Sequence, residues 1–171
     1  HLRYGGKLLG ICGGFQMLGE YLHDPDGLEG HAASTAGLGL LAMETTLQSR
    51  KVLRQVKGTF AMDASKPVTG YEIHLGVSQG EAFSRPLIID DSGQPEGALS
   101  ADEQIAGTYW HGLFDRPEAC NALLAWAGHH RHQSVDFAAL REAGIDRIAD
   151  VWAERVDLAK LNSALERFHR R

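Results

Sequence analysis

Cys12 stands in the stretch GICGG, between an apolar run and the start of a helix-like pattern. This arrangement is typical of a nucleophile elbow, where a sharp turn from strand to helix raises a nucleophile above the sheet. Glycines on either side keep such a turn free of Cβ clashes. Unpaired N–H groups at the helix start favour a thiolate, and the Gly13 N–H can point at a developing oxyanion. The alternative is a buried structural cysteine beside a packing glycine pair.

A cysteine nucleophile needs a base, and two histidines are candidates for that role. His111, in GTYWHGLF, follows a predicted strand and lies between Gly107 and Gly112, so we expect it at the edge of a sheet. His74, in GYEIHLG, is its rival. Each of them is alternatively a hydrogen-bonded histidine with a purely structural role.

Motifs for metal or nucleotide chemistry are not found in the sequence. The HHRH run at 129–132 has no cysteine or carboxylate at ligand spacing, so we interpret it as a solvated helix end and expect no metal site. No phosphate-binding loop of the form G-x-x-x-x-G-K-[ST] is present either. The three tryptophans are assigned to the core or to an interface.

Composition favours a globular enzyme of the cytoplasm. A length of 171 residues, 43% of them hydrophobic, suits one domain with a small appendage. The net charge of -5 gives no sign of a nucleic-acid partner or an anionic membrane surface. No apolar run approaches the roughly 18 residues of a membrane-spanning helix, and no signal peptide is visible. Two cysteines make no disulfide framework.

The order of predicted elements indicates an α/β domain. We expect a short buried strand at 7–11, a helix over 14–22, a loop over 23–37 and strands from 37 to about 99. Two further strands at 96–114 should flank a turn at 101–103. A helix should begin at Pro117, and two or three short helices should fill 135–171.

Four segments, in this order, carry a specific resemblance: GICGGFQMLG, DPDGLEG, GYEIHLG and GTYWHGLFD. Together they resemble the C-terminal glutamine amidotransferase domain of cobyric acid synthases, from about residue 5 to the end and more loosely in the tail. Related corrinoid and cell-wall amidotransferases share the cysteine and the histidine. The resemblance implies an α/β, class I glutamine amidotransferase-like (flavodoxin-like) fold.

The resemblance also implies a division of the reaction between two domains. Cys12, helped by His111, would attack the carboxamide of L-glutamine and form a glutamyl thioester, releasing ammonia and then glutamate. Gly13 would supply an oxyanion N–H, while Gly14 and Gln16 would contact the substrate. No cofactor is implied for this domain.

An N-terminal synthetase domain, which uses ATP and Mg, would receive the ammonia. It would amidate four peripheral carboxylates (b, d, e and g) of the corrinoid acceptor adenosylcobyrinic acid a,c-diamide, in cobalamin biosynthesis. Two alternatives stay open. The first is a sibling amidotransferase with another acceptor, of the cobyrinic acid a,c-diamide synthase or cell-wall type, and the second is a non-catalytic partner-binding module.

This sequence departs from the resembled pattern in two places. Many class I amidotransferases carry a glutamate two residues after the catalytic histidine, whereas Leu113 stands there, so Glu72 or His74 is a candidate to orient His111. The strands and glycine loop that precede the cysteine in the family are also missing. We therefore expect residues 1–171 to be a C-terminal amidotransferase domain, partial at its N-terminal side, without its synthetase domain and prone to self-association.

Overall fold

The computed structural model describes residues 1–130 and 136–169. It comprises two compact units, His1–Ser134 and Val135–Arg171. The elements of the first unit are η1 (Leu2–Tyr4), β1 (Leu8–Ile11), α1 (Gly13–Leu18), β2 (Tyr21–Asp24), β3 (Ala33–Ala36), β4 (Glu44–Phe60), β5 (Asp63–Gln79), η2 (Glu81–Ser84), β6 (Ile88–Asp90), β7 (Pro95–Glu96), β8 (Ala98–Leu99), β9 (Ile105–Thr108), β10 (Trp110–His111) and α2 (Pro117–Trp126).

Two sheets build this unit, which is a mixed α/β fold as predicted. In the described residues, the first sheet has the order β1-β9-β8, with β1 parallel and β8 antiparallel to β9. The second has the order β10-β5-β4-β2-β3, and β6 and β7 extend it beside β4. The chain crosses from one sheet to the other between β9 and β10, so the strand carrying His111 follows directly on the strand beside β1.

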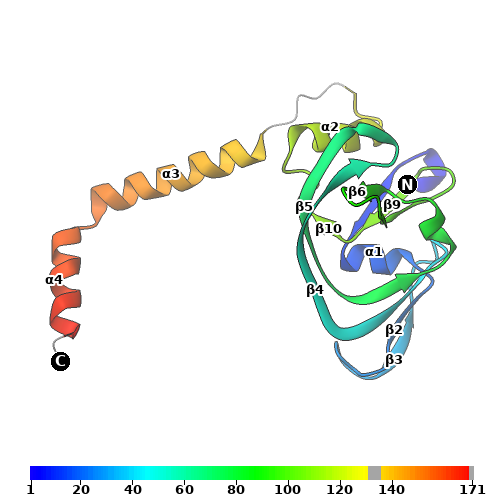
Figure 1. The fold of residues 1–171 in the computed structure, drawn as a ribbon, viewed down its shortest axis with the longest axis horizontal. Coiled ribbons are helices and arrows are strands. Elements are labelled where there is room, and N and C mark those ends of the chain that lie inside the picture. The colour runs from blue at the N-terminus through cyan, green and yellow to red at the C-terminus, as the bar shows by residue number, and fades with distance from the viewer. Residues whose placement is uncertain (131–135, 170–171) are drawn as a thin grey trace. The chain divides into compact units, whose positions relative to one another are not determined.

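The long strands β4 and β5 form a curved antiparallel ribbon, which Figure 1 shows as the largest feature of the unit. Its register shifts between Thr46 and Lys51. There, four residues of β4 stand opposite Gly76 of β5, which has a φ of 101°. A bulge of this kind bends a strand and re-aims its side chains.

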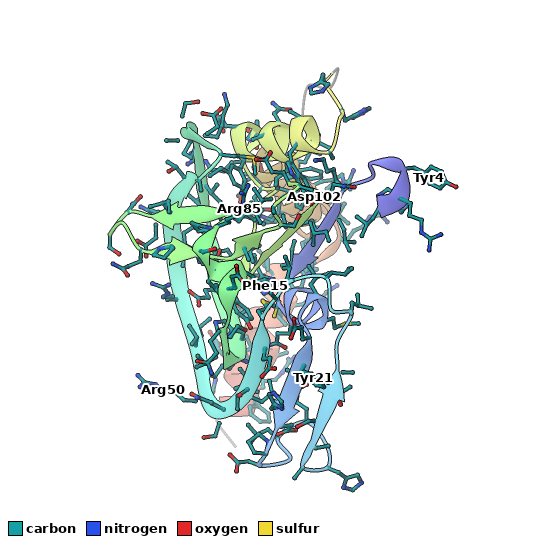
Figure 2. All side chains as sticks on the ribbon, turned by 90° about the vertical axis from the view of Figure 1, so that its right-hand side faces the viewer. Tyr4, Phe15, Tyr21, Arg50, Arg85 and Asp102 are labelled. Carbon is teal, nitrogen blue, oxygen red and sulfur yellow. The ribbon has the colours of Figure 1, made fainter. Side chains whose placement is uncertain are left out.

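The core lies on both sides of the first sheet, because successive strand residues point to opposite faces. Ala98 and Ile105 face one buried cluster with Phe15 and Leu18 of α1. Leu99, next in sequence, faces a second cluster that includes residues of β4, β5, β10 and α2. Figure 2 shows Phe15 in the middle of the body, where it is fully buried.

Two sequence expectations near α1 are wrong. The helix ends at Leu18 rather than at residue 22, because Gly19 has an extended backbone (φ −70°, ψ −178°). The next residue, Glu20, donates its N–H to Met43 O at 2.7 Å, and the chain continues as β2. The expected loop at 23–37 is also partly a hairpin, since β3 pairs with β2 and is exposed along its whole length.

The strand expected at 7–11 is present as β1, but it is not a buried strand, since Gly10 is its one buried residue. Further predictions for the first unit are confirmed. Strands β8 and β9 flank the turn at residues 101–103, and α2 begins at Pro117. His129 and His130 follow the end of α2, whereas residues 131–132 of the HHRH run lie outside the described residues. In the described part of the chain, β1 forms an edge of its sheet, because it pairs with β9 alone.

The second unit consists of α3 (Phe137–Arg155) and α4 (Leu158–His169), in agreement with the prediction of two or three helices. The Asp136 side chain caps α3 by accepting the Ala139 N–H at 3.0 Å. Along α4, exposed apolar residues recur at helical spacing: Leu158, Leu161, Leu165 and Phe168. None of the helices in the described ranges is long and apolar enough to cross a membrane.

Candidate active site

Cys12 occupies the turn between β1 and α1, and its backbone is strained. Its φ of 55° and ψ of −117° are sparsely populated for a residue with a side chain. The N–H of Cys12 donates to Thr108 O of β9 at 2.9 Å. Its carbonyl accepts the N–H groups of Phe15 and Gln16 at 3.0 and 3.2 Å. The strand-to-helix turn predicted from the sequence is therefore present, held from both sides.

Of the glycines around Cys12, only Gly10 stands where a side chain would clash. A Cβ on Gly10 would lie 2.7 Å from a Leu18 methyl and 2.8 Å from the Gly14 carbonyl, so this position has no room for a side chain. Neither Gly13 nor Gly14 would bring a Cβ within 4 Å of another group. The space beside Gly13 is therefore open next to the thiol, where a substrate can approach.

A cavity of about 370 Å³ opens in front of Cys12. This volume lies within the range of about 300–1,000 Å³ that is usual for small-molecule sites. Its walls come from the elbow, the loop after β2, the β4–β5 ribbon and β10. The lining residues are Cys12, Gly13, Gln16, Glu29, Leu47, Lys51, Ile73, His74, Leu75 and His111. A larger hollow of about 710 Å³ beside α2 contains neither Cys12 nor the two candidate histidines.

The β5 backbone holds the elbow side of this cavity. The Cys12 thiol donates to Ile73 O at 3.3 Å, and the Gln16 amide donates to Leu75 O at 3.0 Å. Gln16 is 8% exposed. The two hydrogen bonds join α1 to the ribbon, so Gln16 has a structural contact in addition to its place in the cavity wall.

His111 reaches the cavity from β10, which pairs with β5 opposite Tyr71. The two rings stack with their centroids 4.9 Å apart and their planes 4° from parallel. His111 Nε2 is buried and has no hydrogen-bond partner among the residues that the structure describes. A buried ring nitrogen without a partner is costly unless a ligand or reacting group meets it.

Glu72 points to His74 and not to His111. Its carboxylate accepts hydrogen bonds from His74 Nε2 at 2.8 Å and from Arg54 Nε at 2.7 Å. The hydrogen bond from His74, with that from Arg54, holds the pKa of Glu72 below its usual value. Since a carboxylate only accepts, the proton of this pair lies on His74 Nε2. The Glu72 carboxylate thus orients His74, and its expected role in orienting His111 has no support in these contacts.

His74 is held from a second side by Tyr109. Their rings stack with centroids 3.8 Å apart, and the Tyr109 hydroxyl hydrogen bonds to Ser78. The His74 side chain is only 8% exposed, and its buried Nδ1 has no partner in the described part of the chain. Both candidate histidines therefore present an unpartnered ring nitrogen and line the same cavity as the thiol.

Glu96 of β7 supports the corner that joins β9 to β10. Its carboxylate accepts the Thr108 hydroxyl at 2.6 Å and the Tyr109 N–H at 2.7 Å. Thr108 in turn accepts the Trp110 N–H at 3.0 Å on its hydroxyl and the Cys12 N–H on its carbonyl. Burial raises the pKa of Glu96 to about 7, although these two hydrogen bonds oppose the change.

The comparison with known families agrees with this geometry. The family model of the CobB/CobQ-like glutamine amidotransferase domain matches residues 1–119, which include the elbow, the ribbon and β10. The chain belongs to this family. This CobB/CobQ-like domain therefore uses glutamine as its substrate, and its mixed α/β fold is that of class I glutamine amidotransferases.

Five of the seven site residues expected from the sequence line one cavity of this CobB/CobQ-like domain, and Gly14 and Glu72 lie outside its lining. Three further residues, Glu29, Lys51 and Glu96, are not predicted to have a role from the sequence. Glu29 lies within a motif that carried the resemblance, which is a signal that could have singled it out. In the described residues, no group of three or more His, Cys, Asp or Glu side chains is placed to hold a metal ion.

Proposed function

We propose that this chain is the glutaminase part of a cobyric acid synthase. It would hydrolyse glutamine and supply ammonia for ATP-dependent amidation of four peripheral carboxylates of adenosylcobyrinic acid a,c-diamide. The observation that carries the proposal is that Cys12 and His111 line one cavity, and that the buried Nε2 of His111 has no hydrogen-bond partner among the described residues. The motif order of the sequence supports the choice of acceptor.

In the proposed reaction, Cys12 is the nucleophile and His111 is the base. The thiol leaves the Ile73 carbonyl, His111 Nε2 takes its proton, and the sulfur attacks the carboxamide carbon. The Gly13 N–H stabilises the oxyanion of the tetrahedral intermediate. As the carbon–nitrogen bond breaks, His111 returns the proton to the leaving nitrogen, which departs as ammonia.

The resulting glutamyl thioester is then hydrolysed. A water molecule gives a proton to His111 and adds to the thioester carbon, and the carbon–sulfur bond breaks to release glutamate and the thiolate. The ammonia would pass to a synthetase domain that uses ATP and Mg, and none of the steps at Cys12 requires either of them.

Selective labelling by a glutamine analogue tests this proposal. L-6-diazo-5-oxonorleucine, an electrophile shaped like glutamine, should alkylate Cys12 and spare Cys120. Cys120 is 6% exposed, and burial raises the pKa of its thiol, so its thiolate is scarce at neutral pH. Peptide mapping by mass spectrometry measures both sites, and excess L-glutamine should protect Cys12. Equal labelling of the two cysteines, or no protection by glutamine, would contradict the proposed role.

A further inference from the structure

The cavity of Cys12 has charged side chains at its exposed rim and thiol, amide and imidazole groups on its floor. Glu29 and Lys51 are the only charged carboxylate and ammonium side chains among its lining residues, and both are exposed. Within the described residues, neither side chain has a hydrogen-bond or ion-pair partner. The floor consists of the thiol, the Gln16 amide and the two histidine rings. One negative and one positive group are thus free at the mouth of a site whose interior suits a neutral amide.

Glu29 is presented by a loop whose backbone is fixed. The Asp24 carboxylate accepts the N–H groups of Leu28 and Glu29 at 2.8 and 2.9 Å. These backbone hydrogen bonds, of which the one from Glu29 has the largest effect, hold the pKa of Asp24 below its usual value. Asp24 is the last residue of β2, so the loop that carries Glu29 is tied to the end of a strand.

Lys51 is placed by the bulge in the β4–β5 ribbon. It is the first β4 residue after the register shift, and it pairs with Leu75, which also lines the cavity. A Cβ on Gly76 would lie 2.8 Å from Thr46 O, so glycine lets the two strands approach at the bulge. Arg50, one residue earlier, projects from the outside of the bend in Figure 2. The bulge therefore separates two neighbouring basic residues, and Lys51 is the one that lines the cavity.

We propose that Glu29 and Lys51 bind the α-ammonium and the α-carboxylate of the substrate, which places its carboxamide at Cys12. This assignment rests on the proposed glutaminase function and extends it to the recognition of a free α-amino acid. An L-amino acid carries both charges on one carbon, so two fixed groups of opposite charge also select its orientation. His74 lines the same cavity, and its Nδ1, which has no partner among the described residues, can accept an N–H of the ligand when the ring is neutral.

The test compares two Cys12 reagents that differ in these charges. L-6-diazo-5-oxonorleucine carries the α-ammonium and the α-carboxylate, whereas iodoacetamide carries neither. In Glu29→Gln and in Lys51→Gln, the second-order rate of Cys12 labelling by the diazo-ketone should fall about tenfold, the loss expected for one hydrogen bond to a charged group. Labelling by iodoacetamide should stay within twofold of the unmodified chain. Glu81→Gln and Lys57→Gln, whose charges lie outside the cavity lining, are the matched controls.

Substrate analogues separate the two roles. Glutaramic acid lacks the α-ammonium, so its weak competition against labelling should be unchanged in Glu29→Gln and weakened in Lys51→Gln. The proposal is overturned if the diazo-ketone labels both variants as fast as the unmodified chain, or if both reagents slow equally. If the diazo-ketone does not label Cys12 in the unmodified chain, the glutaminase proposal itself fails, and this assignment fails with it.

Discussion

Replacing Glu96 by glutamine should remove a loss of stability that the unmodified chain shows between pH 5 and pH 8. In the fold, the Glu96 carboxyl has its pKa raised by burial from 4.5 to about 7, whereas in the unfolded chain it ionises near 4.5. Between these values the folded chain holds a proton that the unfolded chain has lost. The stability linked to this proton is fully present below pH 4.5 and is lost as the pH rises through 7.

The size of the effect follows from the two pKa values. One pKa unit corresponds to 1.36 kcal/mol, so the range from 4.5 to about 7 amounts to about 3 kcal/mol of unfolding free energy by pH 8. Glutamine keeps the shape and stays neutral at every pH. Relative to the unmodified chain, Glu96→Gln should therefore gain up to about 3 kcal/mol as the pH rises from 5 to 8. The fold lowers the pKa values of four aspartates, so their ionisation changes the stability only below this pH range: Asp24, Asp63, Asp90 and Asp102.

Urea unfolding at pH 5, 6, 7 and 8 measures this difference. Both chains should carry Trp152→Phe, because Trp152 lies in α3 of the second unit and the fluorescence should report on the first unit alone, through Trp110 and Trp126. Subtracting the unfolding free energies of the two chains cancels the contributions of the titratable groups that both chains share. A difference that stays constant within about 0.5 kcal/mol from pH 5 to pH 8 would refute the reasoning, and so would a difference of opposite slope.

Two further predictions concern the nucleophile and the strand that carries His111. In a full-length enzyme, Cys12→Ala should abolish glutamine-dependent amidation and leave amidation from ammonium salts intact. Cys120→Ala is the control. Equal loss of activity with both nitrogen donors would contradict the role of Cys12 as the nucleophile. A Cβ on Gly70 would lie 1.8 Å from His111 O, so Gly70→Ala should displace β10. It should lower the free energy of unfolding by about 1–3 kcal/mol and reduce glutaminase turnover at least tenfold. Gly144→Ala, with open space around it, should be neutral or stabilising. Urea unfolding and ammonia release measure both glycine variants.

Local patterns predicted the parts of the site that a few neighbouring residues determine. The elbow at Cys12 follows from an apolar strand, a glycine that cannot carry a side chain and a helix start, all within ten residues. His111 could be placed at a sheet edge because a strand pattern ends there between glycines. These features depend on backbone geometry close to the residue, which sequence patterns describe well.

The missed features depend on partners far along the chain. The helix ends at Leu18, where Gly19 leaves the helical conformation and Glu20 pairs with Met43. Glycine is a local stop signal, but the pairing that carries the chain on as a strand is with a distant residue. Strand β3 is exposed on both faces, so it lacks the apolar alternation by which strands are recognised. Lys51 reaches the cavity only through the register shift opposite Gly76, which a single strand sequence does not reveal.

The partner of Glu72 was mispredicted for a related reason. Leu113 stands where many class I amidotransferases carry the orienting glutamate, so the sequence offers Glu72, from another motif, as a candidate in its place. In a strand, residues two apart lie on one face, so Glu72 meets His74 of its own strand, whereas His111 pairs with Tyr71 on the neighbouring position. The pleat of β5 decides between the two histidines.

The pairing of β1 with β9 has a consequence for the order in which this chain folds. The β4–β5 ribbon forms through contacts that begin at a short turn, whereas β1 pairs with β9 in parallel and joins residue 8 to residue 105. Closing so long a loop costs more entropy, and parallel pairing between distant segments is slow. The strained turn at Cys12 is held by Thr108 at the end of β9, so it can form only after that closure. In a nascent or partly folded chain, Cys12 would therefore lack the strained turn, and it would become the nucleophile only after β1 has paired with β9.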